Sequence, residues 1–217
     1  MSNQSPDAMN VIGRVESNHN WAAINPSDPI TLGMMQWYGN RAKGLILLGK
    51  QNDPSGYSQY FSQTTAAQQA EANADMSYYY VNQDDEQSWH AWAATDSNHQ
   101  FQQAQWESDF TAYQGVCDSH GFPSQNIRER IFFMTMYHQS PESAFRVLGS
   151  VSGTASLQLL HTTALNDSVL RSYPNRYNTA YDMLVNWDGT SAPPDFGQVG
   201  DAPASGGNPS NNNITST

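Results

Sequence analysis

A glutamate close to the N-terminus is the residue best suited to chemistry in this chain. Glu16 ends an apolar segment in Arg14-Val15-Glu16-Ser17, and the short sequence Gly33-Met34-Met35-Gln36 follows it. Apolar surroundings favour the protonated form of a carboxyl group near neutral pH, which is what a general acid requires. A carboxyl group at the end of an apolar helix, facing a glycine turn, is what acid-catalysed cleavage of a glycosidic bond needs.

Helices are the elements expected to position these residues. Ser5 and Pro6 predict the start of a first helix, which carries apolar residues at helical spacing and delivers Glu16 at its C-terminal end. Residues 31–36 are expected to form a turn or a brief strand. Further helices are predicted at 41–49, 65–82, 86–94, 100–120, 125–139, 141–149, 154–166 and 174–187. No run of alternating strands appears, so the fold is predicted to be mostly α.

Composition limits the classes of partner. The chain has 217 residues, a net charge of −11 and only nine Lys and Arg residues. Nucleic acids and anionic membranes are bound chiefly through basic side chains, so neither is an expected partner. No stretch approaches the roughly 20 apolar residues of a membrane span.

The chain divides at about residue 190. Residues 1–189 are expected to form one domain, because 190–217 are rich in Pro, Gly, Ser and Asn and read as a flexible linker or tail. Such a linker suggests a further module after residue 217. Met1-Ser2-Asn3-Gln4 begins a polar segment without the basic and apolar regions of a signal peptide, so from this start export is expected to use another route. The single Cys117 excludes an intramolecular disulfide.

Other chemistries have little support in the sequence. The histidines show no His-Glu-x-x-His spacing and there is no Cys-x-x-Cys pair, so no metal site is expected. No Gly-x-Gly-x-x-Gly or phosphate-loop pattern occurs, and no cofactor is expected. Cys117 and His120 lie close together on a predicted helix, whereas a Cys-His peptidase usually assembles from distant positions.

Three segments together resemble a known family. Arg14-Val15-Glu16-Ser17, Gly33-Met34-Met35-Gln36 and Tyr137-His138-Gln139-Ser140-Pro141 are similar, in order and approximate spacing, to the motifs of soluble lytic transglycosylases and goose-type lysozymes. That family has a Glu-Ser pair, then Gly-Leu-Met-Gln, then Ala-Tyr-Asn-Ala-Gly-Pro. The third motif keeps only its Tyr and Pro here. The resemblance covers residues 10–147 and implies a lysozyme-like helical domain with at most a very small β element beside the cleft.

The resemblance also implies roles for individual residues. Glu16 would protonate the glycosidic oxygen, and Tyr137 would orient the acid or stabilise developing charge. The bond would be the β-1,4 linkage between N-acetylmuramic acid and N-acetylglucosamine of peptidoglycan. A bacteriophage lysin or a lysozyme module of a phage tail, acting on the bacterial cell wall, would fit such a chain. The expected substrate-binding residues are Thr31, Gly33, Met35, Gln36, Trp37 and Tyr38.

The second catalytic group is left open by the sequence. In an inverting hydrolase a second carboxylate activates the attacking water, and the two carboxyl groups lie roughly 6.5 to 9.5 Å apart. Asp28 is the best candidate for this carboxylate because it lies between the first two motifs. Asp53 is a reserve candidate. Without such a carboxylate, the 6-hydroxyl of the sugar would attack and give 1,6-anhydro products, as in lytic transglycosylases. A chitinase or chitosanase, and a non-catalytic wall-binding or structural virion module, are the further alternatives.

Aromatic residues are the remaining signal for sugar binding. Trp37 and Tyr38 are favoured for the cleft because they follow the Gly33 motif directly. Trp21, Trp89, Trp92 and Trp106 fit either the core or a binding surface. Tyr78-Tyr79-Tyr80 cannot all face inward on one helix, so at least one of the three is expected to be exposed.

Overall fold

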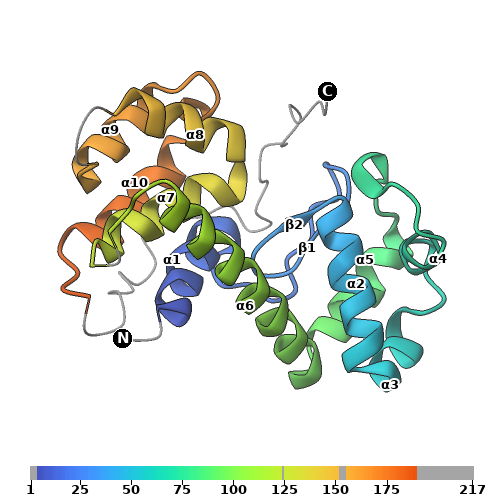
Figure 1. Cartoon of the computed structure of the whole chain (residues 1–217). Coiled ribbons are helices and arrows are strands. Elements are labelled where there is room, and N and C mark those ends of the chain that lie inside the picture. Colours follow the sequence, from blue (N-terminus) through green and yellow to red (C-terminus); the bar gives the residue numbers. More distant parts are fainter. Residues whose placement is uncertain (1–3, 124, 152–154, 190–217) are drawn as a thin grey trace. The chain divides into compact units, whose positions relative to one another are not determined.

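The chain folds mostly into helices, as predicted. A computed structural model describes residues 4–123, 125–151 and 155–189, and contains ten α-helices and one two-stranded sheet in that part of the chain (Figure 1). These residues form two compact units, one made of the residues before Glu16 and from Asp109 onward, the other of Glu16–Ser108. The predicted tail, 190–217, lies outside the described residues. None of the described helices is long and apolar enough to cross a membrane.

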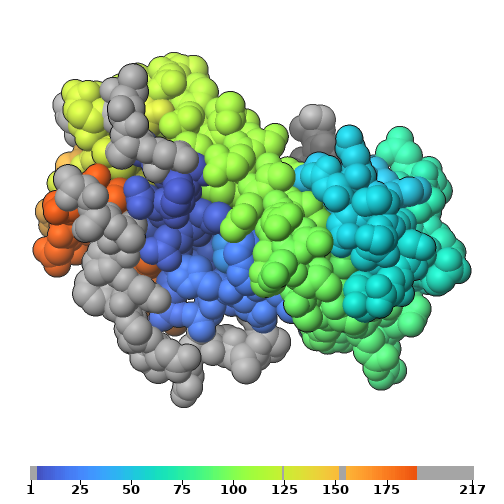
Figure 2. Space-filling view, turned by 90° about the horizontal axis from the view of Figure 1, so that it is seen from below, coloured from blue at the N-terminus to red at the C-terminus, as the bar shows by residue number. Residues whose placement is uncertain are grey.

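The second unit carries the small sheet and the short helices. Its strands β1 and β2 are antiparallel, with Thr31 opposite Tyr38 and Leu32 opposite Trp37. In Figure 2 its later residues, coloured cyan to green, form one continuous block. Its elements are β1 (Thr31–Leu32), β2 (Trp37–Tyr38), α2 (Asn40–Asn52), α3 (Pro54–Gly56), the π-helical turn η1 (Tyr57–Phe61), α4 (Thr65–Glu71), the 3₁₀ turn η2 (Met76–Tyr78), α5 (Gln83–Ala93) and the first half of α6 (Asp96–Ser119).

An aromatic cluster forms the core of the second unit. The Trp92 ring lies 4.8 Å from Phe101, 5.5 Å from Phe61 and 6.0 Å from Trp89, measured between ring centroids. Trp89, Trp92 and Trp106 have no exposed surface, so these three tryptophans belong to the core. A Cβ at Gly49 would lie 2.4 Å from Trp92, so glycine allows α2 to pack directly on this ring.

The first unit is a bundle of helices (Figure 1). It contains most of α1 (Ser5–Ser17), the second half of α6, α7 (Ile127–Gln139), α8 (Pro141–Ser150), α9 (Leu157–Asn166), the 3₁₀ turn η3 (Leu170–Ser172) and α10 (Pro174–Val185). Helix α7 is central, because α8, α9 and α10 all contact it. Phe132 and Tyr177 are fully buried, and the Tyr177 hydroxyl donates to Gln139.

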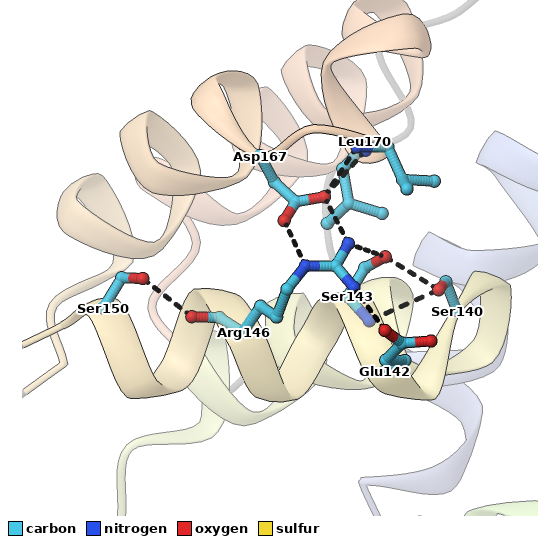
Figure 3. A network of polar contacts seen from close by, with 8 residues as sticks. Ser140, Glu142, Ser143, Arg146, Ser150, Asp167 and Leu170 are labelled. Atoms are coloured by element: carbon cyan, nitrogen blue, oxygen red, sulfur yellow. Dashed lines mark hydrogen bonds and ion pairs between the residues drawn. The ribbon is translucent and has the colours of Figure 1, made fainter.

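One polar network fastens α8 to the loop after α9 (Figure 3). The Arg146 guanidinium donates to both oxygens of Asp167, from Nε at 3.0 Å and from Nη2 at 3.1 Å. Burial opposes ionisation of Asp167, but the hydrogen bonds from Arg146 and from the amides of Leu170 and Val169 outweigh it. They hold the pKa of Asp167 below its ordinary value. Ser140 caps α8, and Pro141 occupies its first position, as the sequence predicts.

The helix predicted at 65–82 is wrong after Glu71. Helix α4 ends at Glu71, and Asn73 adopts a left-handed backbone conformation with φ 55°. Asp75 then caps the next turn by accepting a hydrogen bond from the Ser77 amide, and Asn82 caps α5. These short polar side chains satisfy backbone groups locally and so compete with a continuous helix.

Candidate active site

Glu16 lies at the C-terminal end of α1, in the second unit, and is buried with 4% of its surface exposed. The helix stops there because Asn18 and His19 both adopt left-handed conformations, with φ 56° and 60°. The Ser17 hydroxyl donates to the Met34 carbonyl at 2.7 Å. The residue after Glu16 is thus tied directly to the Gly33-Met34-Met35-Gln36 segment.

That segment is the tight turn between β1 and β2. The Gln36 amide donates to the Gly33 carbonyl at 2.9 Å, and the Gln36 side chain donates to the same oxygen at 3.0 Å. The Gly33 amide in turn donates to the Ala23 carbonyl at 2.8 Å. The turn is therefore closed internally and anchored to the loop that precedes it.

Gly33 is required by two independent features of this turn. Its φ of 78° is a conformation that other residues rarely adopt, and a Cβ there would lie 2.5 Å from Oε1 of Gln102. Oε1 of Gln102 accepts a hydrogen bond from the Met34 amide at 2.9 Å. The missing side chain at Gly33 is what allows α6 to support the turn at this distance.

Gln36 is strained and incompletely hydrogen-bonded. It has a φ of 51°, and strained residues of this kind are often found at functional sites. Its Oε1 is buried and accepts no hydrogen bond from any residue that the structure describes. An unpaired buried acceptor costs about 1–3 kcal/mol, which a hydrogen-bond donor on a ligand would recover.

Asp28 lies in the loop before β1 and is buried, with 8% of its surface exposed. Its Oδ2 accepts a hydrogen bond from the Asn25 side chain at 2.8 Å. Burial raises the pKa of Asp28 above the ordinary aspartate value. A carboxyl group of this kind holds a proton at higher pH than a surface aspartate does.

The other predicted binding residues lie in the same hairpin, with different degrees of exposure. Met35 and Trp37 have no exposed surface, and Thr31 has 1%. The Thr31 hydroxyl donates to the Pro29 carbonyl at 2.8 Å. The Trp37 ring supports the hairpin from inside, so its contact with a sugar stays a prediction. Tyr38 is partly exposed and donates from its hydroxyl to the Ser77 carbonyl at 3.0 Å.

Two further candidates for catalysis, Tyr137 and the reserve residue Asp53, belong to different units. Tyr137 belongs to α7 of the first unit, where its ring contacts Tyr113, Phe133 and Phe145, so its role beside the acid stays a prediction. Asp53 caps α3 by accepting from the Gly56 amide at 3.0 Å and also accepts from Nε1 of Trp92 at 2.9 Å. These hydrogen bonds give Asp53 a structural role.

Sequence reasoning missed the residues that hold the site in place. Gln102 donates from Nε2 to the Trp21 carbonyl at 2.9 Å and to Asn98 at 2.6 Å, besides supporting Met34. Trp21 itself stacks on His99 at 4.6 Å. Nothing in the sequence distinguishes Gln102 from Gln100, Gln103 and Gln105 beside it.

Comparison with known proteins gave no match, either to a family model, to a characterised protein or to a solved structure. The assignment of function therefore depends on the residues and their arrangement.

Proposed function

We propose that this chain cleaves the β-1,4 bond between N-acetylmuramic acid and N-acetylglucosamine in bacterial peptidoglycan, with a lysozyme-like domain and Glu16 as the general acid. The observation that carries the proposal is the hydrogen bond from Ser17 to the Met34 carbonyl. It joins the buried Glu16 and the Gly33–Gln36 turn, which are the two better-preserved motifs of the resemblance. The setting would be the bacterial cell wall, attacked by a phage lysin or a phage tail module.

The two buried carboxyl groups suit an acid and a base. Glu16 would donate its proton to the glycosidic oxygen as the bond breaks. Asp28 would take a proton from a water molecule that attacks the anomeric carbon from the opposite face, as in inverting glycosidases. The raised pKa of Asp28 makes its ionised form a stronger base than a surface aspartate.

The hairpin supplies groups that suit a neutral amide-bearing sugar. The unpaired Oε1 of Gln36 would accept the N–H of an acetamido group, and the partly exposed Tyr38 offers an aromatic surface. A net charge of −11 disfavours polyanionic substrates. N-acetylhexosamine chains carry such amides.

The Glu16→Gln variant tests the assignment of the acid. Release of soluble muropeptides from purified cell walls should fall by about a hundredfold to ten-thousandfold, the usual contribution of a general acid. Glu107→Gln, an exposed glutamate on α6, is the matched control and should keep full activity. Undiminished release by Glu16→Gln would remove Glu16 from the mechanism.

Analysis of the products separates the two mechanisms. Mass spectrometry that finds reducing muropeptide ends supports hydrolysis assisted by Asp28, and Asp28→Asn should then lose activity. Products with 1,6-anhydro ends would instead show that the 6-hydroxyl of the sugar attacks and that Asp28 is not the base. Cleavage of chitin oligomers without cleavage of cell walls would favour a chitinase.

A further inference from the structure

The Tyr78-Tyr79-Tyr80 segment presents two aromatic rings to solvent. Tyr79 turns inward, and its hydroxyl donates to the buried Asp85. Tyr78 and Tyr80, on either side of it, are 80% and 55% exposed. Tyr79 has an extended backbone, with φ −85° and ψ 119°, and side chains on either side of an extended residue point the opposite way from it. The exposure of at least one tyrosine is thus confirmed.

This segment runs along the hairpin of the candidate active site. The Ile30 amide donates to the Tyr79 carbonyl at 2.6 Å, and Tyr80 forms an isolated antiparallel bridge with Pro29. Pro29 directly follows Asp28 in the chain. The exposed Tyr80 is therefore joined by backbone pairing to the loop that carries the candidate base.

The two rings are held on a fixed backbone. The Asn40 side chain donates to Asp75 at 2.8 Å and accepts from the Met76 amide at 3.1 Å, so α2 fixes the start of the segment. A Cβ built on Gly39 would lie 3.2 Å from Cα of Ser77, which shows how closely the two backbones approach. A pre-positioned surface of this kind loses little conformational freedom when it binds a ligand.

Tyr38 connects these rings to the site. Its hydroxyl donates to the Ser77 carbonyl at 3.0 Å, one residue before Tyr78. The isolated bridge between Tyr80 and Pro29 places Tyr80 beside the residue that follows Asp28. The three tyrosines and Asp28 thus share one region of the second unit.

We propose that Tyr78 and Tyr80 form a stacking surface for pyranose rings, which extends the glycan-binding site from Asp28 and Tyr38 along the η2 segment. This inference rests on the proposed function. A flat ring stacks on the apolar face of a sugar while its hydroxyl stays in water, which suits tyrosine better than an aliphatic residue. Asp28 and Asp75 in the same region disfavour a densely anionic ligand, so we assign the surface to a neutral glycan.

Binding of chitohexaose, a soluble neutral β-1,4 glycan, tests the inference. Titration calorimetry in the Glu16→Gln background keeps the ligand intact. Tyr78→Ala and Tyr80→Ala should each weaken binding about two- to tenfold, and the double variant about tenfold or more. Tyr78→Phe and Tyr80→Phe should bind as the parent does, because stacking needs the ring and not the hydroxyl. Tyr60→Ala, at a partly buried tyrosine on η1, is the matched control and should also bind as the parent does.

The outcomes separate this inference from the proposed function. Unchanged affinity of the double variant, or a parent that does not bind chitohexaose, would overturn the stacking surface. So would a loss of self-association on double substitution with unchanged glycan binding, because a second copy of the chain would then be the occupant. If Glu16→Gln still cleaves cell walls, the acid assignment fails, and the affinities are then compared only for titrations after which mass spectrometry finds chitohexaose intact.

Discussion

Oε1 of Gln102 accepts a hydrogen bond from the Met34 amide at 2.9 Å, although 68 positions separate the two residues in the chain. The same side chain donates to the Trp21 carbonyl and to Asn98. One amide side chain on α6 therefore fixes both the hairpin turn and the loop that follows Glu16. The geometry of the candidate site depends on a residue that contributes no chemistry of its own.

Replacing Gln102 by leucine should destabilise the second unit. The substitution keeps the volume but leaves the Met34 amide and the Trp21 carbonyl without this partner, at a cost of about 1–3 kcal/mol for the buried amide and less for the partly buried carbonyl. Urea denaturation should show a lower free energy of unfolding, and glycan cleavage should fall as well. Gln103→Leu, at the exposed neighbouring position, is the control and should leave both unchanged. Equal stability of the two variants would mean that water replaces the Gln102 side chain at no cost.

Two glycine substitutions should have opposite effects on stability. Gly33→Ala places a side chain in a left-handed conformation, which costs about 1–2 kcal/mol, and its Cβ would also collide with Gln102. Gly44→Ala, in α2, should instead stabilise the protein by up to about 1 kcal/mol, because alanine favours a helix and an added Cβ would meet no described residue within 4 Å outside its own helix. Thermal unfolding of both variants provides the measurement. A stable Gly33→Ala protein would contradict the role given to this turn.

The sequence predicts the helices well where local signals agree. Ser140 and Pro141 mark the start of α8, and the caps and apolar spacing place α1, α7 and α10 close to their observed ranges. It fails after Glu71, where Asp75 and Asn82 form local turns that a count of helix-forming residues does not detect. Local hydrogen bonds of this kind depend on backbone geometry as well as on residue type.

For the candidate site, the sequence predicts positions near each other in the chain but not the contacts between distant positions. Gly33, Gln36 and Asp28 are predicted from the resemblance that the surrounding motifs carry. The support from Gln102 is not, because a glutamine on a glutamine-rich helix has no distinguishing pattern. The sequence also does not show which aromatic side chain is exposed. Trp37 and Tyr38 are adjacent, and in strand β2 one is buried while the other is partly exposed.

The Arg146–Asp167 network should give the first unit a pH-dependent stability. Asp167 has a folded-state pKa below its ordinary value of about 3.9, so its contribution is present above that value and is lost as the pH falls through the lowered pKa. Arg146→Gln should lower the free energy of unfolding by about 1–2 kcal/mol at neutral pH, an estimate reduced because the arginine is partly exposed. The difference from the parent should shrink in acid. Glu142→Gln, which breaks only the exposed ion pair with Arg146, should cost less than about 0.5 kcal/mol.

The pH dependence of Asp28 should have the opposite sign. Because burial raises its folded-state pKa, the parent gains stability from the protonated form below the ordinary aspartate pKa and loses it as the pH rises through the raised value. Asp28→Asn keeps an oxygen that can accept from Asn25 but cannot ionise. The variant should therefore match the parent in acid and become more stable than the parent towards neutral pH, as measured by urea denaturation across about pH 3 to 7.

The same variant should lose activity in the pH range where it gains stability, since the ionised Asp28 is the proposed base. Asp182→Asn, an exposed aspartate on α10, controls for the change in net charge and should leave cleavage unaffected. A gain in stability with full activity would show that the Asp28 carboxylate is not the catalytic base, and the 6-hydroxyl of the sugar would then be the attacking group. A loss of activity together with the gain in stability is the result expected if the buried Asp28 carboxylate lowers the stability of the fold but is needed for catalysis.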